Sequence, residues 1–358
     1  MTVDLNLGRQ VSRVLHARQD ELAEAIVARH YERQPQLWKP FGDEGRQKSV
    51  RDTKYHLTYL LEAIAAQEAT LFTEYLAWVK ALFVGLGFPA HVVPSALLIM
   101  QETLRENLEA DEAAVVDEYI AAGLAHFAQA PETPPGHLAA DAPLGDLAQT
   151  YLDYLLAGQR QLASRLVLEA VSGGASVKQI YRHVFQPVQR EIGRLWQMNR
   201  VTVAQEHYCT AATQLIMSQL YPFIFSEARV GRSLVATAVD GELHEIGVRM
   251  VADFFEMEGW DTYYMGANVP AADILNTLAE QEAHLLAISA TIPAHTGKVR
   301  RLIATLRESE VGSKTLIVVG GYPFNQSPQL WRSVGADGYA SDADEALEVA
   351  AALLEGHS

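Results

Sequence analysis

The first third of the chain carries the spacing of amphipathic helices. Apolar residues recur at Val11, Leu15, Leu22 and Ile26, with charged residues between them, which places them on one face of a helix. Later segments repeat this pattern, and prolines separate the segments from one another. The pattern predicts an all-helical domain over residues 1–128 with five to seven helices.

A proline-rich stretch then interrupts the helical pattern. Prolines concentrated in residues 129–144 predict a linker. Residues 145–226 return to helical spacing, and the short joints between their apolar segments predict a four-helix bundle. Within this bundle we expect one continuous helix over 147–171, an N-terminal cap at Ser176, and a kink or break before Pro187.

The last part of the chain, residues 232–358, alternates short apolar runs with amphipathic helical segments. Runs of small and branched apolar residues are typical of buried parallel strands. We therefore expect an α + α/β multidomain protein that ends in a doubly wound parallel sheet of the Rossmann or flavodoxin type. The expected strands are 234–239, 261–266, 285–290 and 315–321, and the expected helices are 245–259, 271–282, 294–308 and 344–354.

Composition narrows the class of protein. The formal net charge of -16 argues against sequence-independent nucleic-acid binding, which depends on a surplus of Lys and Arg. A single cysteine, Cys209, excludes intramolecular disulfides and suits a reducing compartment. The N-terminus does not have the apolar core of a signal peptide, and no apolar run is long enough to span a membrane. We therefore expect a cytoplasmic protein without a membrane partner.

Polar residues follow the expected strands, at the edge where doubly wound sheets bind ligands. After the first strand, Glu242, His244 and Gly247 stand at Glu-x-His-x-x-Gly spacing. A carboxylate two residues before a histidine can accept one ring N–H and so orient the imidazole toward a metal. The alternative is an exposed loop histidine beside a helix-capping glutamate. The later strands are followed or ended by Ser289, Thr291, Gly320 and Gly321.

These motifs resemble the cobalamin-binding fold of methionine synthase and the corrinoid proteins. That family carries Asp-x-His-x-x-Gly, Ser-x-Leu and Gly-Gly signatures at fixed distances. Here 41 residues separate Gly247 from Ser289, and 28 separate Thr291 from Gly320, which matches the distances in the family. The resemblance implies that His244 is the lower axial ligand of cobalt and that the nucleotide tail of the cofactor lies in a channel beside the sheet.

The same resemblance assigns roles to the residues after the later strands. It implies that Gly320 and Gly321 leave room for the nucleotide tail and that Ser289 and Thr291 hydrogen-bond this tail. Two positions depart from the signatures, because Glu242 replaces the aspartate and Thr291 replaces the leucine.

The helical bundle contains a second group of candidate residues. Nine residues separate Trp196 from the adjacent Glu206 and His207, which resembles the bundle motif of CarH-type cobalamin photoreceptors. The resemblance implies that the indole covers the 5′-deoxyadenosyl group of adenosylcobalamin and that Glu206 and His207 hydrogen-bond it. Gln197 stands where those proteins have a second histidine that captures cobalt, so the axial ligand of the photoproduct stays open. The alternative is a core tryptophan with a surface Glu-His pair.

The N-terminal helices are similar to bacterial sensor-globin domains. A globin-like domain joined to a CarH-like module resembles the photocobilins, which combine cobalamin with a linear tetrapyrrole. That resemblance implies biliverdin as a second chromophore, held noncovalently because the only thiol lies in the bundle. Haem in the same domain, bound through His56 or His91, stays open. The candidates for contacting the propionates and rings of the bilin are Arg33, Lys54, His56 and Tyr59.

Together these features predict a light sensor rather than an enzyme. Light would break the cobalt–carbon bond, the adenosyl group would leave, and the bundle would shift against the sheet. With no effector domain expected after the sheet, the output would be a change in a homo-oligomer, such as a dimer, or in a contact with a separate effector protein. Two alternatives stay open, namely a corrinoid carrier for methyl transfer and a haem-globin gas sensor with a cobalamin domain.

Overall fold

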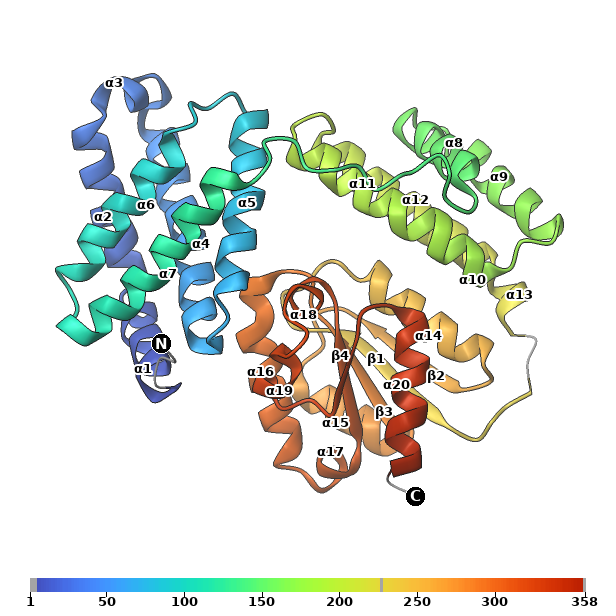
Figure 1. The fold of residues 1–358 in the computed structure, drawn as a ribbon. Helices are drawn as coiled ribbons and strands as arrows, with labels where there is room; N and C mark the ends of the chain where they lie inside the picture. The colour runs from blue at the N-terminus through green and yellow to red at the C-terminus, as the bar shows by residue number, and fades with distance from the viewer. Residues whose placement is uncertain (1–4, 226–227, 357–358) are drawn as a thin grey trace. The chain divides into compact units, whose positions relative to one another are not determined.

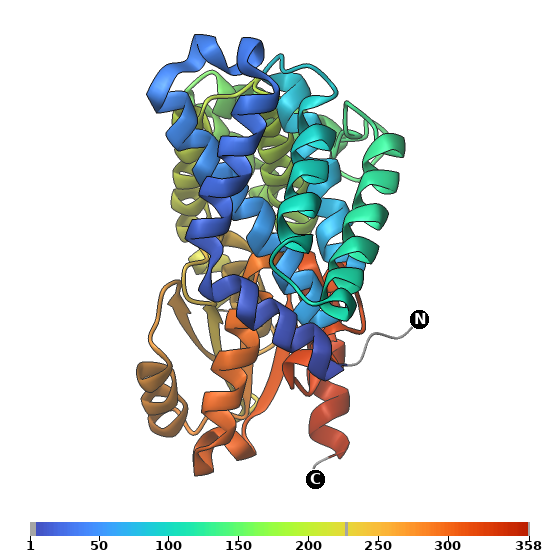
Figure 2. The same cartoon turned by 90° about the vertical axis from the view of Figure 1, so that its left-hand side faces the viewer.

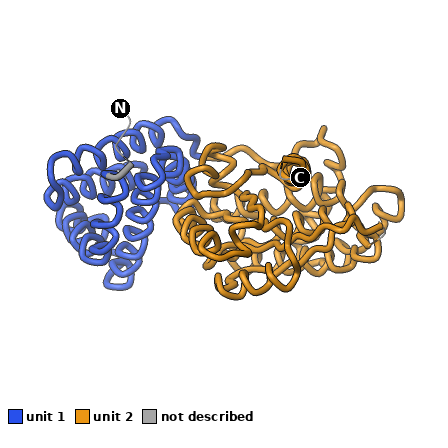
Figure 3. Tube along the Cα trace, turned by 90° about the horizontal axis from the view of Figure 1, so that it is seen from below, with its two compact units in different colours: residues 1–132 blue, residues 133–358 orange. Residues whose placement is uncertain are grey.

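The chain divides into two compact units, residues 1–132 and 133–358 (Figure 3). A computed structural model describes residues 5–225 and 228–356. No helix in these two ranges is both long enough and apolar enough to cross a membrane. The predicted domains 1–128, 145–226 and 232–358 include residues 1–4, 226 and 357–358, which lie outside the described residues.

The first unit is helical throughout its described part, and most of its helices lie side by side (Figures 1 and 2). Its core contains fully buried apolar residues such as Leu57, Leu60, Leu61 and Phe72. This confirms the expected helical N-terminal region, while its likeness to a sensor globin stays a prediction. Its elements are α1 (Leu5–Ala17), α2 (Gln19–Arg33), α3 (Pro35–Trp38), η1 (Lys39–Phe41), α4 (Gly42–Ala66), α5 (Ala69–Gly85), α6 (Val92–Arg105) and α7 (Ala110–Gln129).

The second unit begins with a set of helices that we call the helical subdomain (residues 145–224). The continuous helix expected over 147–171 is wrong, because Gly158 has a φ of +72° and breaks it into two. A left-handed residue cannot continue an α-helix, and glycine adopts this conformation without a steric penalty. The helices of the subdomain are α8 (Gly145–Leu156), α9 (Arg160–Ser172), α10 (Val177–Ile180), α11 (Gln186–Gln197), α12 (Val203–Gln219) and α13 (Tyr221–Ile224).

The joint between α10 and α11 is a π-helical segment, η2 (Tyr181–Phe185). It ends two residues before Pro187, where the sequence predicted a kink or break. Proline cannot donate the hydrogen bond that a regular helix needs there. The predicted cap at Ser176 is also present. Its hydroxyl accepts a hydrogen bond from the backbone N–H of Gln179 at 3.1 Å.

The α/β part of the second unit contains a five-stranded parallel sheet with the order β2-β1-β3-β4-β5 among the described residues. This confirms the expected parallel sheet and adds a fifth strand of three residues to the four strands that the sequence located. Because the chain leaves β1 toward β2 and returns on the other side of β1, the topology reverses between β1 and β3. The strands are β1 (Ser233–Ala238), β2 (Asp261–Gly266), β3 (Leu285–Ser289), β4 (Leu316–Gly320) and β5 (Gly338–Ala340).

Helices cover both faces of this sheet (Figure 1). Helices α14 and α20 pack on one face, where Leu234 and Ala236 of β1 meet Val248 and Phe255 of α14. The right-handed crossovers from β2 to β3 and from β3 to β4 put α15 and α16 on the other face. The helices are α14 (Ile246–Met257), α15 (Ala271–Glu280), η3 (Pro293–His295), α16 (Thr296–Arg307), α17 (Glu310–Lys314), α18 (Tyr322–Gln326), α19 (Leu330–Val334) and α20 (Ala343–Gly356).

The helical subdomain packs on α14. Met250 and Phe254 of α14 belong to the same apolar cluster as the subdomain core. At the edge of this contact, the hydroxyl of Tyr181 donates a 2.7 Å hydrogen bond to the carboxylate of Asp253, which is only 6% exposed. Burial raises the pKa of Asp253 to about 6, although the hydrogen bond from Tyr181 and the charge of Arg249 oppose this shift.

We predict that Asp253→Asn changes the pH dependence of stability. A carboxyl group whose pKa is higher in the folded than in the unfolded protein stabilises the fold below about pH 4, and this contribution is lost as the pH rises through 6. The asparagine carries no such penalty, so the variant should gain about 2–3 kcal/mol relative to wild type between pH 4 and pH 7.5. Urea denaturation at several pH values measures this difference.

The control for this prediction is Asp344→Asn, which removes an exposed acid that pairs with Arg182 between η2 and α20. Its stability relative to wild type should change little over the same pH range, since exposed ion pairs contribute little. Parallel curves for Asp253→Asn and wild type would show that Asp253 does not titrate as described.

Candidate functional site

The register of the sheet brings the loops after β1, β3 and β4 together. Ala238 pairs with Ser289, and Ser289 pairs with Gly320, so the carboxyl ends of these strands lie side by side. The loops after β1 and β3 flank the point where the topology reverses. In open α/β sheets this crevice is where ligands bind.

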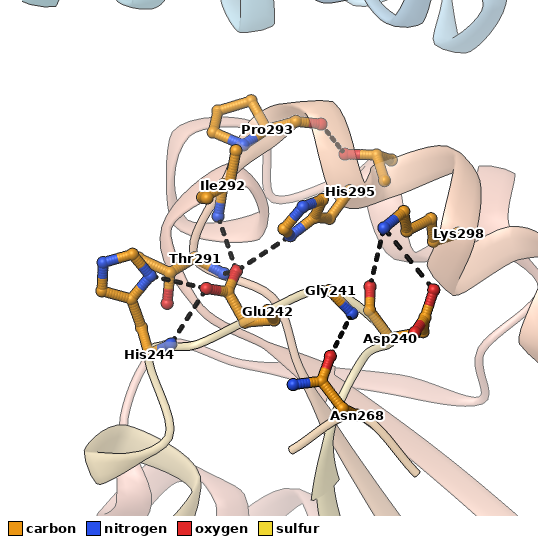
Figure 4. Close-up of polar contacts among 11 residues, drawn as sticks. Asp240, Gly241, Glu242, His244, Asn268, Thr291, Ile292, Pro293, His295 and Lys298 are labelled. Atoms are coloured by element: carbon orange, nitrogen blue, oxygen red, sulfur yellow. Dashed lines mark hydrogen bonds and ion pairs between the residues drawn. The ribbon is translucent and has the colours of Figure 1, made fainter. Parts of the chain in front are cut away.

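The carboxylate of Glu242 is the centre of this edge (Figure 4). Its side chain is 0% exposed. Oε1 accepts hydrogen bonds from the backbone N–H of His244 at 3.1 Å and from its Nδ1 at 2.5 Å. Oε2 accepts from the backbone N–H groups of Thr291 at 2.7 Å and Ile292 at 3.0 Å, and from Nδ1 of His295 at 3.2 Å. Glu242 therefore ties the loop after β1 to the loop after β3.

These donors keep Glu242 ionised. Burial by itself would raise its pKa, but the hydrogen bonds from His244, His295 and the backbone outweigh burial and hold the pKa of Glu242 well below its usual range. A buried carboxylate with this many N–H donors is a fixed anion rather than a proton carrier at neutral pH.

The imidazole of His244 is held at one nitrogen and open at the other. Its side chain is 59% exposed, and its Nδ1 faces Glu242, so Nε2 is directed away from the carboxylate (Figure 4). The hydrogen bond to Glu242 raises the pKa of His244, burial opposes this shift, and the charge of Glu206 adds to it. A histidine with this partner has a fixed tautomer and can offer Nε2 to a metal.

His295 is a contributor that the sequence analysis did not identify. The sequence predicted a helix over 294–308, whereas the structure has the 3-10 turn η3 before α16 begins at Thr296. This turn points the ring of His295 back at Glu242. A histidine in the loop after the third strand was the available signal, but only the folded chain shows which carboxylate it meets.

The predicted glycines have different local surroundings. A Cβ on Gly320 would lie 2.9 Å from the carbonyl oxygen of Ala340, and one on Gly321 would lie 2.1 Å from that of Ala290. Gly321 also has a φ of +103°, so backbone packing by itself requires glycine there. At Gly247, in contrast, a Cβ would meet no described atom within 4 Å, so packing does not require glycine at the start of α14.

The other residues predicted to contact the nucleotide tail lie at the same edge. Ser289 is the last residue of β3 and is half-buried, and Thr291 is half-buried two residues later. The backbone of Thr291 is engaged with Glu242. The contacts of both side chains with a nucleotide tail stay a prediction.

The helical subdomain presents Glu206 toward this edge. Glu206 is 29% exposed, and its charge is close enough to His244 to raise the pKa of that imidazole. His207 is 76% exposed, with Nε2 3.5 Å from Oε2 of Glu206. Trp196 is half-buried near the end of α11, and the adjacent Gln197 is buried. The structure thus brings Glu206 near the predicted cobalt ligand, while the contacts of Trp196 and His207 with an adenosyl group stay predictions.

The candidates for the second chromophore lie in the first unit. Ion pairs engage two of them, with Arg33 2.6 Å from Glu102 and Lys54 2.7 Å from Asp20. Nδ1 of the buried His56 lies 2.7 Å from the hydroxyl of Tyr75, and burial lowers the pKa of His56 to about 4. Tyr59 stacks on Tyr75 with ring centroids 3.6 Å apart.

The possible metal ligands at the sheet edge fit a metal ion that is already held by a cofactor. Within residues 5–225 and 228–356, no group of three or more His, Cys, Asp or Glu is arranged to hold a metal ion. One outward-facing imidazole is sufficient for an axial position on a metal that a macrocycle already holds. His244, fixed by Glu242, offers that imidazole, and the space beside Gly247 leaves the start of α14 open to a close approach.

Comparison with known families agrees with this description of the site. Residues 232–348 match a B12 binding domain family, and residues 147–221 match a second B12 binding domain family. Residues 6–158 match the phycobilisome protein family. The α/β domain and most of the helical subdomain therefore form a cobalamin-binding module.

Individual relatives are corrinoid proteins. The chain is 32% identical over 122 residues to dimethylamine corrinoid protein 3 of Methanosarcina acetivorans, which covers 34% of this chain and 56% of that protein. It is 30% identical over 122 residues to dimethylamine corrinoid protein 3 of Methanosarcina mazei, which covers 34% of this chain and 71% of that protein. The structure of the monomethylamine corrinoid protein of Methanosarcina barkeri has a TM-score of 0.52 and is 20% identical, covering 60% of this chain and 99% of the other.

The fold and the two matching families thus define a cobalamin-binding protein. The chain belongs to the family of B12-binding corrinoid proteins. It spans about half the length of the first curated relative, and the solved structure supports the shared fold.

We predict that Glu242→Gln destabilises the protein by about 2–4 kcal/mol. The amide would turn an NH₂ group toward N–H donors that now meet a carboxylate oxygen, so buried donors would lose their acceptor. Thermal denaturation without cobalamin measures the effect. Glu310→Gln, which changes an exposed glutamate paired with Lys314, is the control and should melt like wild type. An unchanged melting temperature for Glu242→Gln would contradict the described donor set.

We also predict opposite effects for two glycine substitutions. Gly321→Ala should destabilise the protein by about 2–4 kcal/mol, because the φ and the carbonyl of Ala290 both exclude a Cβ. Gly247→Ala should leave the melting temperature unchanged or slightly higher, since alanine favours a helix, yet it should weaken cobalamin binding. Melting curves and cobalamin titrations of both variants test this, and equal cobalamin affinity in Gly247→Ala and wild type would refute the proposed close approach.

Proposed function

We propose that this protein is a cobalamin-dependent light sensor with a second chromophore in its first unit, and that it is not an enzyme. In this proposal adenosylcobalamin is bound with His244 as the lower axial ligand of cobalt, and the helical subdomain covers the upper face. The bound cofactor supplies a cobalt–carbon bond that light can cleave. The protein supplies the ligand, the cover and the coupling to a change in shape.

The observation that carries the proposal is the contact between α12, the helix that bears Glu206, and the residue that follows His244. The carboxylate of Glu206 is close enough to raise the pKa of the His244 imidazole, although it belongs to a different part of the second unit. On the same helix, Gln214 donates a 2.9 Å hydrogen bond to Glu245, which follows His244 directly. Helix α12 therefore runs along the loop that carries His244, as a cover over an upper-face group requires.

Three residues give this cover its chemistry. A half-buried indole at Trp196 offers a flat apolar surface suited to an adenine ring. Carboxylate oxygens of Glu206 can accept hydrogen bonds from ribose hydroxyls, and His207 is exposed enough to reach the same group. When that group leaves, the cover loses its partner and α12 is free to move against the sheet.

The axial ligand after illumination follows from Gln197. This residue is buried and has no imidazole, so it cannot supply a second histidine to cobalt. His207 is the exposed imidazole nearest in sequence to this position. We propose that the light state carries either His207 or a solvent oxygen in the upper position.

The proposal places noncovalent biliverdin in the first unit. The match of residues 6–158 to the phycobilisome protein family supports a bilin rather than haem, because the family takes its name from bilin-bearing assemblies. The ion pairs of Arg33 and Lys54 are exposed, and such pairs are exchanged at little cost, so both cations remain candidates for the propionates. His56 and Tyr59 lie at the aromatic group around Tyr75.

A second candidate function is a corrinoid carrier for methyl transfer. The names of the relatives favour it, because these are corrinoid proteins named for dimethylamine and monomethylamine. A carrier needs an upper face that a methyltransferase can reach. A cover by Trp196, Glu206 and His207, as proposed, would favour the sensor. Either a change in oligomeric state or an effector protein would then carry the output.

Absorbance spectra separate the two functions. We predict that dark-purified protein loaded with adenosylcobalamin converts under green light. Red light should convert it only when biliverdin is also bound. His244→Ala should lose the His-ligated cobalamin spectrum. His284→Ala, which changes a histidine that contacts Ser233 at the start of β1, should retain it.

The opposite result favours the carrier. If the adenosylcobalamin spectrum is unchanged by light, biliverdin passes through unbound, and methylcobalamin is turned over with a methyl donor, then the sensor proposal is wrong. Gel filtration in the dark and after illumination would show whether the output is a change in oligomeric state.

A further inference from the structure

A row of polar side chains crosses the helical subdomain behind Glu206. Oε1 of Glu206 accepts a 2.9 Å hydrogen bond from the hydroxyl of Thr210, which lies 3.3 Å from Oε1 of Gln189. Nε2 of Gln189 donates to the hydroxyl of Thr213 at 2.7 Å, and this hydroxyl lies 2.9 Å from that of Tyr151. The row therefore connects α12, α11 and α8.

The inner end of this row lies in the apolar core. Thr213 and Tyr151 are both 0% exposed, and Tyr151 belongs to the apolar cluster of the subdomain. Burial raises the pKa of Tyr151, so its hydroxyl keeps its proton and needs an acceptor. Apolar residues of similar size would fill this space without a desolvation cost. The buried polar groups are therefore better explained by a role in orienting their hydrogen-bond partners than by packing.

The number of protons available in the row determines which group donates and which accepts in each hydrogen bond. Thr210 has one hydroxyl proton, and it lies within reach of two acceptors, the carboxylate of Glu206 and Oε1 of Gln189. Rotating the Gln189 amide by a half-turn exchanges its oxygen and nitrogen, so that Thr210 faces one donor and one acceptor. The two orientations occupy nearly the same space. Nε2 then donates to Thr210, Oε1 accepts from Thr213, and Thr213 accepts from Tyr151. In this arrangement each group donates to the next, and the row ends at the anion of Glu206.

We propose that Gln189, Thr210 and Thr213 are positioning residues that fix the orientation of the Glu206 carboxylate for recognition of the upper-face group of cobalamin. This inference rests on the proposed function, in which Glu206 contacts that group. With Oε1 occupied by Thr210, Oε2 is the oxygen that lies on the side of His207, at 3.5 Å from its Nε2. A ligand hydroxyl would thus meet Oε2 of Glu206, whose direction is fixed by the hydrogen bond from Thr210 to Oε1.

The row also links the ligand site to α8. A donor that binds Oε2 of Glu206 competes for its negative charge, which weakens the bond from Thr210 and changes each bond behind it. Tyr151 is the last member, and its ring is packed against Phe185 of the π-helical segment at 5.3 Å between ring centroids. Loss of the upper-face group is therefore transmitted to the buried joint between α10 and α11.

The test compares two forms of cobalamin that differ on the upper face. The measured quantity is the ratio of the affinities for adenosylcobalamin and hydroxocobalamin, obtained by titration in the dark with full-length protein. Thr210→Val removes the hydroxyl at nearly constant volume, and Gln189→Met removes both amide groups. We predict that each lowers this ratio about tenfold, as loss of a hydrogen bond to a charged group does. Thr210→Ser restores the hydroxyl and should restore the ratio.

The control is Thr150→Val on α8. The hydroxyl of Thr150 donates a 2.8 Å hydrogen bond to the backbone carbonyl of Asp146 on the exposed side of α8. Its ratio should equal that of wild type. A purely structural role of Thr210 or Gln189 would lower both affinities together and leave the ratio unchanged, which would overturn the proposal.

Glu206→Gln distinguishes failure of this inference from failure of the proposed function. If Glu206→Gln lowers the ratio but Thr210→Val and Gln189→Met do not, the contact with cobalamin stands and the positioning row is wrong. If Glu206→Gln also leaves the ratio at the wild-type value, Glu206 does not recognise the upper-face group, and both ideas fail.

Discussion

The buried carboxylate of Glu242 is the constraint on which the site depends. A fully buried anion would be costly without partners, yet this one is surrounded by N–H groups from two loops that are about fifty residues apart in sequence. Those backbone N–H groups in turn would lack an acceptor without it. The cost of burying the anion and the cost of leaving the N–H groups unpaired are both avoided only when the loops after β1 and β3 adopt their observed positions together. One side chain thereby joins the two loops that flank the reversal point of the sheet and orients His244.

The two parts of the second unit share one apolar core. Met250 and Phe254 of α14 complete the cluster of the helical subdomain, and Tyr181 bonds to Asp253 beside them. Since α14 begins directly after the His244 loop, a displacement of the subdomain acts on the helix that follows the predicted cobalt ligand. The helical subdomain and the loop of His244 are therefore mechanically connected through α14.

Much of this arrangement could be predicted from the sequence, for identifiable physical reasons. Buried parallel strands require uninterrupted apolar residues, so β1, β3 and β4 were recognised within one residue at each end. The spacing from Gly247 to Ser289 reflects the combined length of α14, β2, α15 and β3. The contact between His295 and Glu242 could not be predicted, because it depends on the turn η3. The three residues of β5 and the break at Gly158 were also missed, since a short strand has no periodicity and an isolated glycine is tolerated in many helices.

The π-helical segment η2 limits which mutations the helical subdomain can accept during evolution. Each residue of an α-helix turns the chain by about 100°, and a π segment accommodates one residue more than the regular helix would. Deleting a residue from Tyr181–Phe185 would make the helix regular, but it would rotate α11 and carry the buried faces of Val188 and Ile192 out of the core. Substitutions in this segment are therefore tolerable where a change of length is not. The π-helical segment therefore determines the rotation of α11 about its axis, and with it the direction in which Trp196 leaves the helix.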